Sequence, residues 1–586
     1  MKIAQILTII AVGCLVTLPV ILHGASVMSY DGANHAMWYS SFSSQLWAGD
    51  LYPRWLLEMN RGLGSPSFFY YPPVAFFLTS LIRPLFPGDV SGLYQLGVSS
   101  AVALTLSGVF VWLWLSKLTD GISAMAAAFM FMITPYHLIM DLYLRCALAE
   151  LWAFVWVPLV LYFTHKTANN DRWAGVGLSI TYALLIATHL PTTLMFSVIP
   201  MGYTVVVAES GQKLRRLARV FGAMSLGIGL SAIFLYPAMT TQSLVYIDRM
   251  NKGFFLFKNW FLFTGFDTWP DDKIRFLVLA IDLAIIAVCA YWITRRTSSN
   301  RSLKNIALYW LVIAVGTTFL MTEISEPVWR IVTPLQKLQF PWRFNIILSL
   351  AVTVLAGLAI SAIRTSVDRY FTPAGVLVLF CVFVWVPCAG WGSASYFMPD
   401  EKSDIDYRNT EFAKKREVPE YRPRSSQTMA ALDWDTLTAS GWGALLADEY
   451  ASLLQRTGAD TEDPVKFRII DGTGSAEIIS WKPRDLLVHV HASSAIRANL
   501  LQFYYPGWEA KLVQHDADLD LRPSEPDGLL SLSVPEGEHY VRLRLVTTKA
   551  ENIGRAITVA SLLGLCLYIG FLLLTKYRTV NAPTAA

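Results

Sequence analysis

The chain has 586 residues, of which 54% are hydrophobic and only 15% are charged, and its mean hydropathy is +0.43. A soluble domain carries about 25% charged residues, and repeated apolar runs of about 20 residues indicate membrane spans, so the composition excludes a soluble protein. The net charge of +4 is too small to indicate a nucleic-acid partner, and the six cysteines lie in or beside apolar segments, which leaves no disulfide framework and no zinc motif.

Apolar runs along the chain predict the membrane topology. Predicted spans lie at about 5–23, 93–116, 120–139, 150–165, 172–190, 191–209, 220–240, 273–294, 304–322, 342–363, 370–392 and 554–576. A further segment, 67–87, is interrupted by prolines. Short basic loops such as 213–219 are expected in the cytoplasm. Counting the membrane crossings back from these loops places 24–92 outside the cell only if 67–87 does not cross the membrane. We therefore predict about twelve spans, an interfacial 67–87, and both termini in the cytoplasm.

A polar, charged region at 394–553 is expected outside the membrane. Its first part is irregular, with a helix near 442–456. Its second part alternates between apolar and polar residues and contains Asp-Gly, Pro-Gly and Pro-Glu-Gly turn signals. The predicted strands are 467–470, 476–481, 486–492, 498–504, 529–534 and 540–546. A β-sandwich-like domain is the interpretation, so the chain divides into a transmembrane domain (1–393), this domain (394–553), and a last helix with a cytoplasmic tail (554–586).

The first candidate carboxylate lies just after the first span. Residues 29–35 read Ser-Tyr-Asp-Gly-Ala-Asn-His, which places Asp31 at the membrane surface and His35 one helical turn later. An aromatic, proline-rich run follows and contains Arg54 and Tyr71. Ionisable groups near membrane depth are costly and indicate function, whereas an aspartate that caps the next helix is the structural alternative.

The predicted outside loop at 140–149 brings further charges to the end of a span. It contains Asp141 and Arg145 and leads into the apolar run that Glu150 begins. An ion pair between Arg145 and Glu150 is the structural interpretation. The functional one is that carboxylates from two loops flank a reacting sugar. One acts as general base on an acceptor hydroxyl, worth roughly a hundred- to ten-thousandfold, and the other orients the base or substrate or helps to hold a metal.

Two more polar residues stand at the outside ends of later spans. His189 lies in a tight turn and suits a structural histidine as well as a functional one. Arg343 ends the Phe-Pro-Trp-Arg motif at 340–343, where a guanidinium suits a lipid-linked phosphate, and snorkelling to headgroups is the alternative. The loop 252–260, rich in Phe and Lys, can clamp a polyprenyl chain or lie in the membrane interface.

These motifs, in this order, resemble the GT-C superfamily of integral-membrane glycosyltransferases. The resemblance rests on Asp31-Gly32 in the first outside loop, on Pro72-Pro73 in the interfacial segment behind it, and on the acidic second loop.

Other segments carry closer resemblances. Segments 63–66, 143–150 and 340–343 resemble bacterial membrane proteins labelled "6-pyruvoyl-tetrahydropterin synthase-related", although no pterin-synthase zinc motif is present. Segments 503–510 and 534–539 resemble the periplasmic β-domain of related proteins that glycosylate lipoteichoic acid.

The resemblance implies a polytopic α-helical membrane protein of GT-C type in the bacterial inner (plasma) membrane, with an extracytoplasmic active site. It implies a polyprenyl-phosphate-linked sugar as donor and usually inversion at the anomeric carbon. The acceptor would be a glycan, a lipid or a protein of the cell envelope. Many family members have two adjacent acidic residues in the first loop, whereas Gly32 follows Asp31 here, so we expect a metal-independent mechanism without a cofactor.

Roles for the candidate residues follow from this interpretation. We predict Asp31 as the catalytic base and Glu150 as the second catalytic carboxylate. Arg343, together with Arg145, is predicted to stabilise the phosphate leaving group. The remaining predicted substrate-binding residues are His35, Arg54, Tyr71 and His189, and no metal ligand is predicted.

Two other function classes compete with a glycosyltransferase. A transporter or flippase of lipid-linked glycans needs discontinuous helices and polar residues at the bilayer midplane, whereas the predicted spans have apolar interiors apart from exceptions such as Asp282. A non-catalytic scaffold that binds envelope glycan would use aromatics such as Tyr504, Tyr505 and Trp508. A packed turn in the β-region is the other interpretation of those aromatics.

Overall fold

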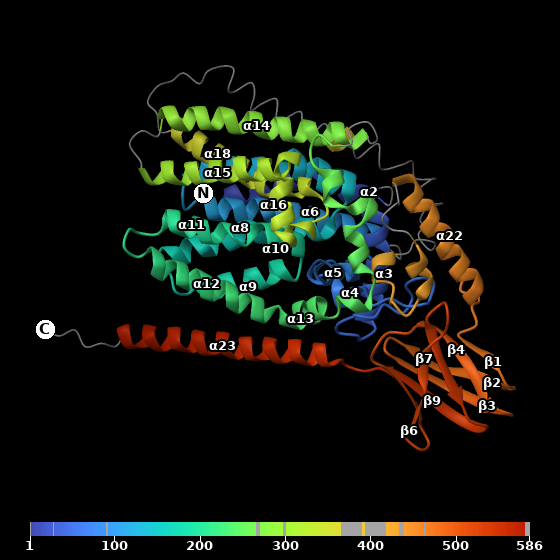
Figure 1. The fold of residues 1–586 in the computed structure, drawn as a ribbon. Coiled ribbons are helices and arrows are strands. Elements are labelled where there is room, and N and C mark those ends of the chain that lie inside the picture. Colours follow the sequence, from blue (N-terminus) through green and yellow to red (C-terminus); the bar gives the residue numbers. More distant parts are fainter. Residues whose placement is uncertain are drawn as a thin grey trace.

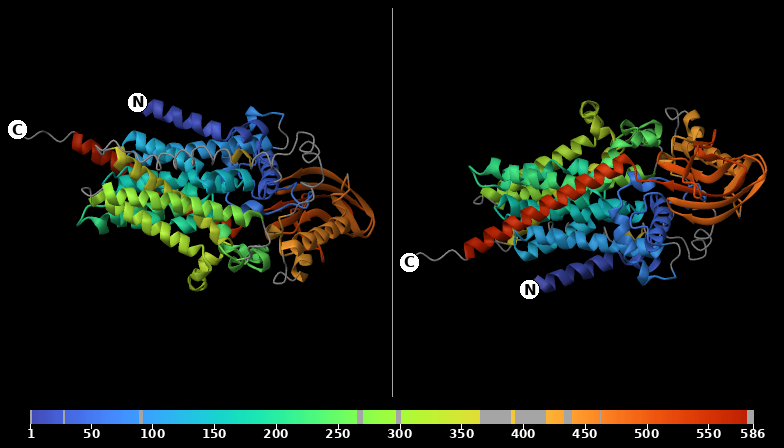
Figure 2. Two further views of the ribbon diagram at one scale, coloured as in Figure 1. Left: turned by 90° about the horizontal axis from the view of Figure 1, so that it is seen from above. Right: turned by 90° about the horizontal axis from the view of Figure 1, so that it is seen from below.

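The computed structural model describes residues 2–26, 29–88, 92–264, 270–296, 301–364, 390–392, 418–432, 439–461 and 463–580. Its helices form a bundle, and two β-sheets lie at one end of that bundle, which we call the sheet end (Figure 1). The last helix, α23 (Lys549–Val580), runs from the sheets back along the bundle. Helix α1 (Lys2–Val16) lies at the side of the bundle in both views of Figure 2.

The bundle is built from apolar helices, since a membrane-spanning segment must satisfy its own backbone hydrogen bonds. The other α-helices are α2 (Leu18–His23), α3 (Gly32–Trp47), α4 (Ser67–Tyr70), α5 (Val74–Ser80), α6 (Leu93–Leu115), α7 (Gly121–Ile133), α8 (Leu148–Ala168), α9 (Ala174–Ile186), α10 (Leu190–Phe196), α11 (Ile199–Val207), α12 (Lys213–Leu230), α13 (Ala232–Thr240), α14 (Pro270–Arg296), α15 (Arg301–Leu320), α16 (Glu326–Ile331), α17 (Thr333–Gln336), α18 (Asn345–Arg364) and α22 (Ala439–Thr457). A π-helix, η2, spans Tyr136–Arg145. Short 3-10 helices are η1 (Arg83–Leu85), η3 (Gln242–Leu244), η4 (Ile247–Asn251), η5 (Gly253–Phe255), η6 (Phe257–Trp260), η7 (Glu323–Ser325), η8 (Pro341–Phe344), η9 (Pro419–Tyr421) and η10 (Gln427–Ala431).

The chain is a multi-pass helical membrane protein with fewer clear spans than predicted. Seven helical stretches in the described part are long and apolar enough to cross a membrane: Leu93–Leu115, Gly121–Arg145, Leu148–Ala168, Leu190–Val207, Arg301–Leu320, Pro341–Ile363 and Lys549–Lys576. The pair α12 and α13, bent by 73°, makes an eighth if it counts as one span.

The prediction of twelve spans is therefore not supported in full. Two of the predicted spans coincide with apolar helices shorter than the roughly 20 residues that a bilayer requires, namely Lys2–Val16 and Ala174–Ile186. The predicted span at 273–294 lies within the longer helix α14. The predicted span at 370–392 lies outside the described residues except at its last three positions.

The predicted loop at 140–149 is wrong. Helix α7 is followed at once by η2, a π-helix that contains Asp141 and Arg145, and the chain turns only at Cys146, whose φ is 52°. Polar residues at the end of an apolar run resemble a loop in the sequence. Here Asp141 and Arg145 pair with one another inside the helix, and the apolar helical stretch continues to Arg145. Helices of this type are frequent at functional sites.

The segment 67–87 forms α4, α5 and η1 and contains no helix of spanning length. Pro72 and Pro73 separate α4 from α5, because proline supplies no backbone donor and restricts the residue before it. The prediction that this segment is interrupted is confirmed.

The C-terminal region forms two antiparallel sheets, with strand orders β1-β4-β8-β7 and β2-β3-β9-β5-β6. The strands are β1 (Phe467–Asp471), β2 (Gly474–Lys482), β3 (Asp485–Ala492), β4 (Ile496–Phe503), β5 (Trp508–Leu512), β6 (Ala517–Leu519), β7 (Leu521–Pro523), β8 (Leu529–Val534) and β9 (Gly537–Leu545). The six predicted strands and the helix near 442–456, which is α22, are confirmed. The short strands β5, β6 and β7 were not predicted.

Buried hydrogen bonds fix the sheets to the loop after α3. The Trp55 indole donates to the side-chain carbonyl of Gln502 (2.8 Å). The Gln502 amide in turn donates to the backbone carbonyls of Leu57 (3.2 Å) and Gly62. Gln502 is fully buried, and its amide therefore ties β4 to this loop.

Aromatic contacts extend the same junction. The Tyr505 and Tyr70 hydroxyls are hydrogen-bonded (2.8 Å), and Trp508 packs edge-on against Trp55 with ring centroids 5.8 Å apart. Tyr505 and Trp508 are only 1% and 4% exposed. These two aromatics belong to a packed turn and not to an exposed glycan-binding surface.

We expect Gly64→Ala to loosen this junction. A Cβ at Gly64 would lie 2.5 Å from Gln502 Oε1 and 2.6 Å from the Trp55 ring. Gly211→Ala is the matched control, because its φ of +86° resembles the +79° of Gly64 but no heavy atom lies within 4 Å of its Cβ. Thermal unfolding of the purified protein in detergent should show Gly64→Ala to be less stable than the control by about 1–3 kcal/mol. Equal losses would mean that the junction tolerates the extra atom.

Candidate active site

Arg145, the last residue of η2, lies among three carboxylates. Its Nη1 donates to Asp141 Oδ1 (2.7 Å) and to Glu150 Oε2 (2.9 Å). Its Nη2 donates to Asp31 Oδ2 (3.2 Å). The guanidinium carbon also lies 5.0 Å from the ring centroid of Trp342. A buried guanidinium is stable only when it is paired and hydrogen-bonded in this way.

The backbone joins the segment before α3 to the end of η2. The Asp31 N–H donates to the Arg145 carbonyl (2.9 Å), and the residues that precede each of them form a second such bond (3.2 Å). A Cβ at Gly32 would collide with the Ser26 carbonyl oxygen. Any side chain at this position, an acidic one included, would therefore disturb the turn that presents Asp31.

Exposure distinguishes the three carboxylates. The Asp31 side chain is 37% exposed, whereas those of Asp141 and Glu150 are 0% and 1% exposed. Both Glu150 oxygens are engaged, since Tyr136 donates to Oε1 (2.7 Å) and Arg145 to Oε2. Asp31 is thus the carboxylate that can meet a substrate, and Glu150 lies behind it.

His35 and Tyr71 form a hydrogen-bonded pair next to Asp31. His35 Nδ1 lies 2.8 Å from the Cys146 carbonyl oxygen, and Nε2 lies 3.3 Å from the Tyr71 hydroxyl. A carbonyl only accepts, so Nδ1 carries the proton and the Tyr71 hydroxyl donates to Nε2. Burial holds the pKa of His35 below its usual value, and the nearby Asp31 carboxylate opposes this effect. His35 is therefore a neutral imidazole that orients Tyr71.

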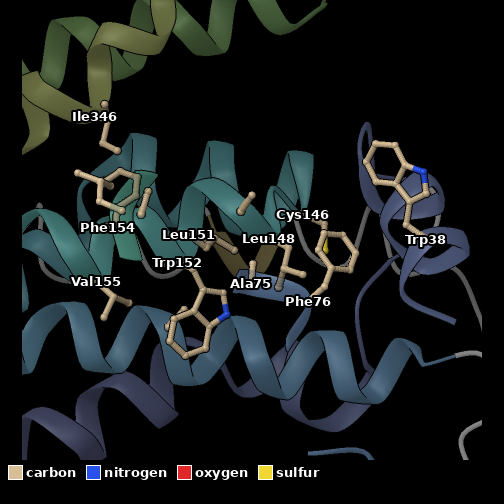
Figure 3. Packing of buried hydrophobic residues seen from close by; sticks show 14 of the residues in the cluster. Trp38, Ala75, Phe76, Cys146, Leu148, Leu151, Trp152, Phe154, Val155 and Ile346 are labelled. Carbon is tan, nitrogen blue, oxygen red and sulfur yellow. The ribbon is translucent and has the colours of Figure 1, made fainter. Parts of the chain in front are cut away.

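Large apolar side chains surround the polar cluster. In Figure 3, Phe76 lies next to Cys146, and Leu148, Leu151 and Trp152 follow along α8. The Phe76 ring is also 6.0 Å from the His35 ring. This packing keeps water from the buried side of the cluster and strengthens its electrostatic interactions.

His189 and Arg343 lie close enough to interact electrostatically with Glu150. His189 Nδ1 forms a hydrogen bond with the Thr192 hydroxyl (2.7 Å). Arg343 is half-buried and donates to the Leu338 carbonyl (3.2 Å). Two residues predicted from separate span ends thus join the same group.

Arg54 lies elsewhere. Its Nη2 donates to the Ile233 carbonyl (2.7 Å), its Nε lies 3.7 Å from Glu551, and its guanidinium lies 4.2 Å from the Tyr52 ring centroid. These contacts join the loop after α3 to α13 and α23. They are not the contacts of a residue that faces Asp31, so the structure gives Arg54 a structural position.

Sequence reasoning left several members of the site unassigned. Asp141 stands four residues before Arg145, a helical spacing at which opposite charges meet, but the predicted loop hid that signal. Trp342 lies inside a motif that drew attention only to Arg343. The Arg275 guanidinium lies 5.1 Å from the Trp342 ring centroid, a contact that no local pattern indicates.

Within the described residues, no group of three or more His, Cys, Asp or Glu side chains is arranged to hold a metal ion. The three carboxylates converge on a guanidinium instead. A metal-independent mechanism stays a prediction.

Comparisons with known proteins give one family and a distant structural similarity. The family model described as "6-pyruvoyl-tetrahydropterin synthase related domain; membrane protein" matches residues 68–390. No curated protein matches the chain. The chain resembles the single-particle cryo-EM structure of the arabinofuranosyltransferase AftD from Mycobacteria at 14% identity and a TM-score of 0.45. That similarity covers 67% of this chain but only 27% of the mycobacterial one.

We expect Arg145→Met to destabilise the protein by about 3–5 kcal/mol, because it leaves the buried Asp141 and Glu150 without their cation. Arg330→Met is the control, since Arg330 pairs with Glu326 on the surface and is 71% exposed, and its loss should cost less than about 1 kcal/mol. Thermal unfolding in detergent measures both. Similar stability of the two variants would show that the carboxylates do not depend on Arg145.

Proposed function

We propose that this chain, which belongs to the family of membrane proteins described as 6-pyruvoyl-tetrahydropterin synthase related, is a membrane glycosyltransferase of the GT-C type. It transfers a sugar from a polyprenyl-phosphate donor to a cell-envelope acceptor on the extracytoplasmic face of the bacterial inner membrane. The observation that carries the proposal is one partly exposed carboxylate, Asp31, held by a buried guanidinium at the end of a span.

In this proposal Asp31 is the general base. Its carboxylate takes the proton from an acceptor hydroxyl while the hydroxyl oxygen attacks the anomeric carbon of the donor sugar. The bond from that carbon to the phosphate oxygen breaks on the opposite face, and the phosphate leaves with the electron pair. Configuration at the anomeric carbon is inverted. General-base catalysis of this kind contributes roughly a hundred- to ten-thousandfold.

Arg145 serves as a positioning residue in this mechanism. Its two terminal nitrogens already donate to Asp31, Asp141 and Glu150, which leaves it poorly placed to bind a phosphate. Through Nη2 it fixes the direction of the Asp31 carboxylate. Glu150 and Asp141 hold the guanidinium in turn.

Arg343 is the cation that we assign to the leaving phosphate. It lies on the same side of the bundle as Glu150 and His189, with which it interacts electrostatically. In the ion pairs of the described residues it has no carboxylate partner, so its charge is available to a substrate. A guanidinium aimed at developing charge stabilises the transition state more than the ground state.

Tyr71 and His35 complete the proposed substrate surface. The neutral His35 ring holds the Tyr71 hydroxyl beside Asp31 and places no second positive charge next to the Asp31 carboxylate. A phenol and an imidazole of fixed orientation suit the hydroxyls of a sugar. We assign these two residues to orientation of the donor sugar.

We expect Asp31→Asn to abolish sugar transfer while the protein stays folded in the membrane, because an amide cannot accept the proton but fills the same space. The measurement is transfer of radiolabel from a panel of polyprenyl-phosphate sugars to an envelope fraction. An unchanged unfolding temperature for the variant shows that the fold is kept. Transfer at the wild-type rate would contradict the assignment of Asp31.

Glu150→Gln separates a positioning role from a catalytic one. The variant keeps a hydrogen-bonding oxygen for Tyr136 but weakens the hold on Arg145, so we expect transfer to fall by about ten- to a hundredfold without disappearing. The readout is kcat against KM for the same donor. Complete loss, equal to that of Asp31→Asn, would show that Glu150 itself takes part in proton transfer.

A further inference from the structure

Four arginines gather at the end of α8 that lies away from the carboxylates around Arg145. Arg172 belongs to the turn between α8 and α9, and the first two turns of α12 carry Arg215, Arg216 and Arg219. The charges of the other three all lie close enough to Arg219 to interact with it electrostatically. We call these four residues the arginine cluster.

One neutral amide holds two of these guanidinium groups. Asn170 Oδ1 accepts hydrogen bonds from Arg219 Nη1 (2.7 Å) and from Arg216 Nη1. Arg216 is only 7% exposed, and its Nε is buried without a hydrogen-bond partner among the described residues. The turn after α8 therefore fixes two cations side by side without neutralising either of them.

The carboxylates nearest in the sequence do not balance this charge. Asp171 lies in the same turn, but its ion pair is with Lys166 (2.8 Å). Glu209, in the loop before α12, is exposed, and among the described residues it pairs with none of the four arginines. The positive end of the α12 dipole also meets the cluster, because the first turn of α12 contains no acidic residue. Positive charges at such a helix end repel one another unless an anion binds among them.

The length of α8 places the arginine cluster at a membrane surface. Helix α8 has 21 residues and joins the carboxylates around Arg145, at Glu150, to the turn that contains Asn170. A helix of this length measures about 30 Å, which is the thickness of the hydrocarbon core of a bilayer. The two charged groups therefore lie on opposite faces of the membrane.

Apolar side chains next to the arginine cluster are open to the membrane. Trp173 follows Arg172 and is exposed. Helix α23 runs along the bundle (Figure 1), and the Tyr568 hydroxyl of this helix donates to the Arg172 carbonyl (2.9 Å). Leu567 and Phe571, near Tyr568, are both exposed. An acyl chain can lie against such side chains while its headgroup meets the arginines, which favours the phosphate of a lipid over free phosphate.

We propose that the arginine cluster binds the phosphate of an anionic phospholipid at the membrane face opposite Asp31, and that Asn170 positions two of its guanidinium groups. Hydrogen bonds from guanidinium groups to phosphate oxygens are charge-assisted and about twice as strong as neutral ones. The bound lipid ties α12 to the α8–α9 turn and to α23. This site does not depend on sugar transfer, since none of its residues takes part in the proposed reaction.

The test uses the full-length protein in detergent micelles with three probes: dioleoyl phosphatidylglycerol, dioleoyl phosphatidylcholine and inorganic phosphate. Native mass spectrometry measures the bound fraction, and thermal unfolding measures the stabilisation that each probe gives. Phosphatidylglycerol should bind and raise the unfolding temperature, because a ligand stabilises the folded state to which it binds. Phosphatidylcholine should bind more weakly, because the arginines repel its choline cation.

Arg216→Gln and Arg219→Gln should each weaken binding of phosphatidylglycerol by about tenfold, as expected for a lost charge-assisted hydrogen bond. Arg301→Gln is the matched control. It removes the same charge from another helix start, the exposed first residue of α15, and should bind like the wild type. Arg172→Gln covers the case in which Arg216→Gln does not fold, since Arg172 is exposed.

Asn170→Gly separates a built site from a general attraction between charges. Glycine accepts the φ of 76° at this position and leaves the net charge unchanged, but it removes the oxygen that holds Arg216 and Arg219. We expect this variant to bind phosphatidylglycerol about fivefold more weakly than the wild type. Binding like the wild type would contradict the positioning role of Asn170.

Wild-type binding in Arg216→Gln, Arg219→Gln and Arg172→Gln would overturn the site. An equal loss in Arg301→Gln would also overturn it, because any arginine near the membrane would then have the same effect. Equal binding of the two phospholipids would contradict an anionic lipid, and equal competition by inorganic phosphate would contradict the lipid as the source of the phosphate. Sugar transfer by Asp31→Asn tests the proposed function alone.

Discussion

The guanidinium of Arg145 is buried together with the carboxylates that neutralise it, and each carboxylate comes from a different turn of the chain. Asp141 lies on η2, Glu150 lies in the first turn of α8, and Asp31 precedes α3. Moving one partner away would leave an uncompensated charge among the remaining groups in a low dielectric, which lowers the stability of the fold. The positions of these three segments are therefore coupled. Asp141 and Glu150 hold the Arg145 guanidinium, and this guanidinium fixes the direction of the partly exposed Asp31 carboxylate.

The sheets at the other side of α3 add a second constraint. Gln502 is buried and bonded to the loop after α3, and Tyr505 is bonded to Tyr70 of α4. From there, Tyr421 of η9 lies 5.8 Å from Trp38 of α3 and stacks on Tyr70 at 6.1 Å. The loop that follows the Asp31 helix is thus held between the helical bundle and the β-strands. These buried contacts join the sheets to α3.

Most residues of the candidate site stood out in the sequence because they interrupt apolar runs. Asp31, Glu150, His189 and Arg343 each stand at the end of such a run, and a charge in that position stands out against its neighbours. Arg54, predicted as a substrate-binding cation in an aromatic loop, lies 3.7 Å from Glu551 and donates to the Ile233 carbonyl, so its role in substrate binding stays a prediction. Whether a cation meets a substrate or a buried partner depends on segments far away in the chain.

The membrane class, the six predicted strands, α22 and the interrupted segment at 67–87 were determined by the sequence alone, since apolar length, alternation and proline act over a few neighbouring residues. Tertiary structure decided the rest. Arg145, at the end of η2, pairs with Asp141 within that helix and with Glu150 and Asp31 beyond it, and Arg275 of α14 comes near the Trp342 ring of η8. Both depend on contacts between segments that are distant in the chain. The energy of a charge paired across the fold therefore cannot be predicted from its neighbours in the sequence.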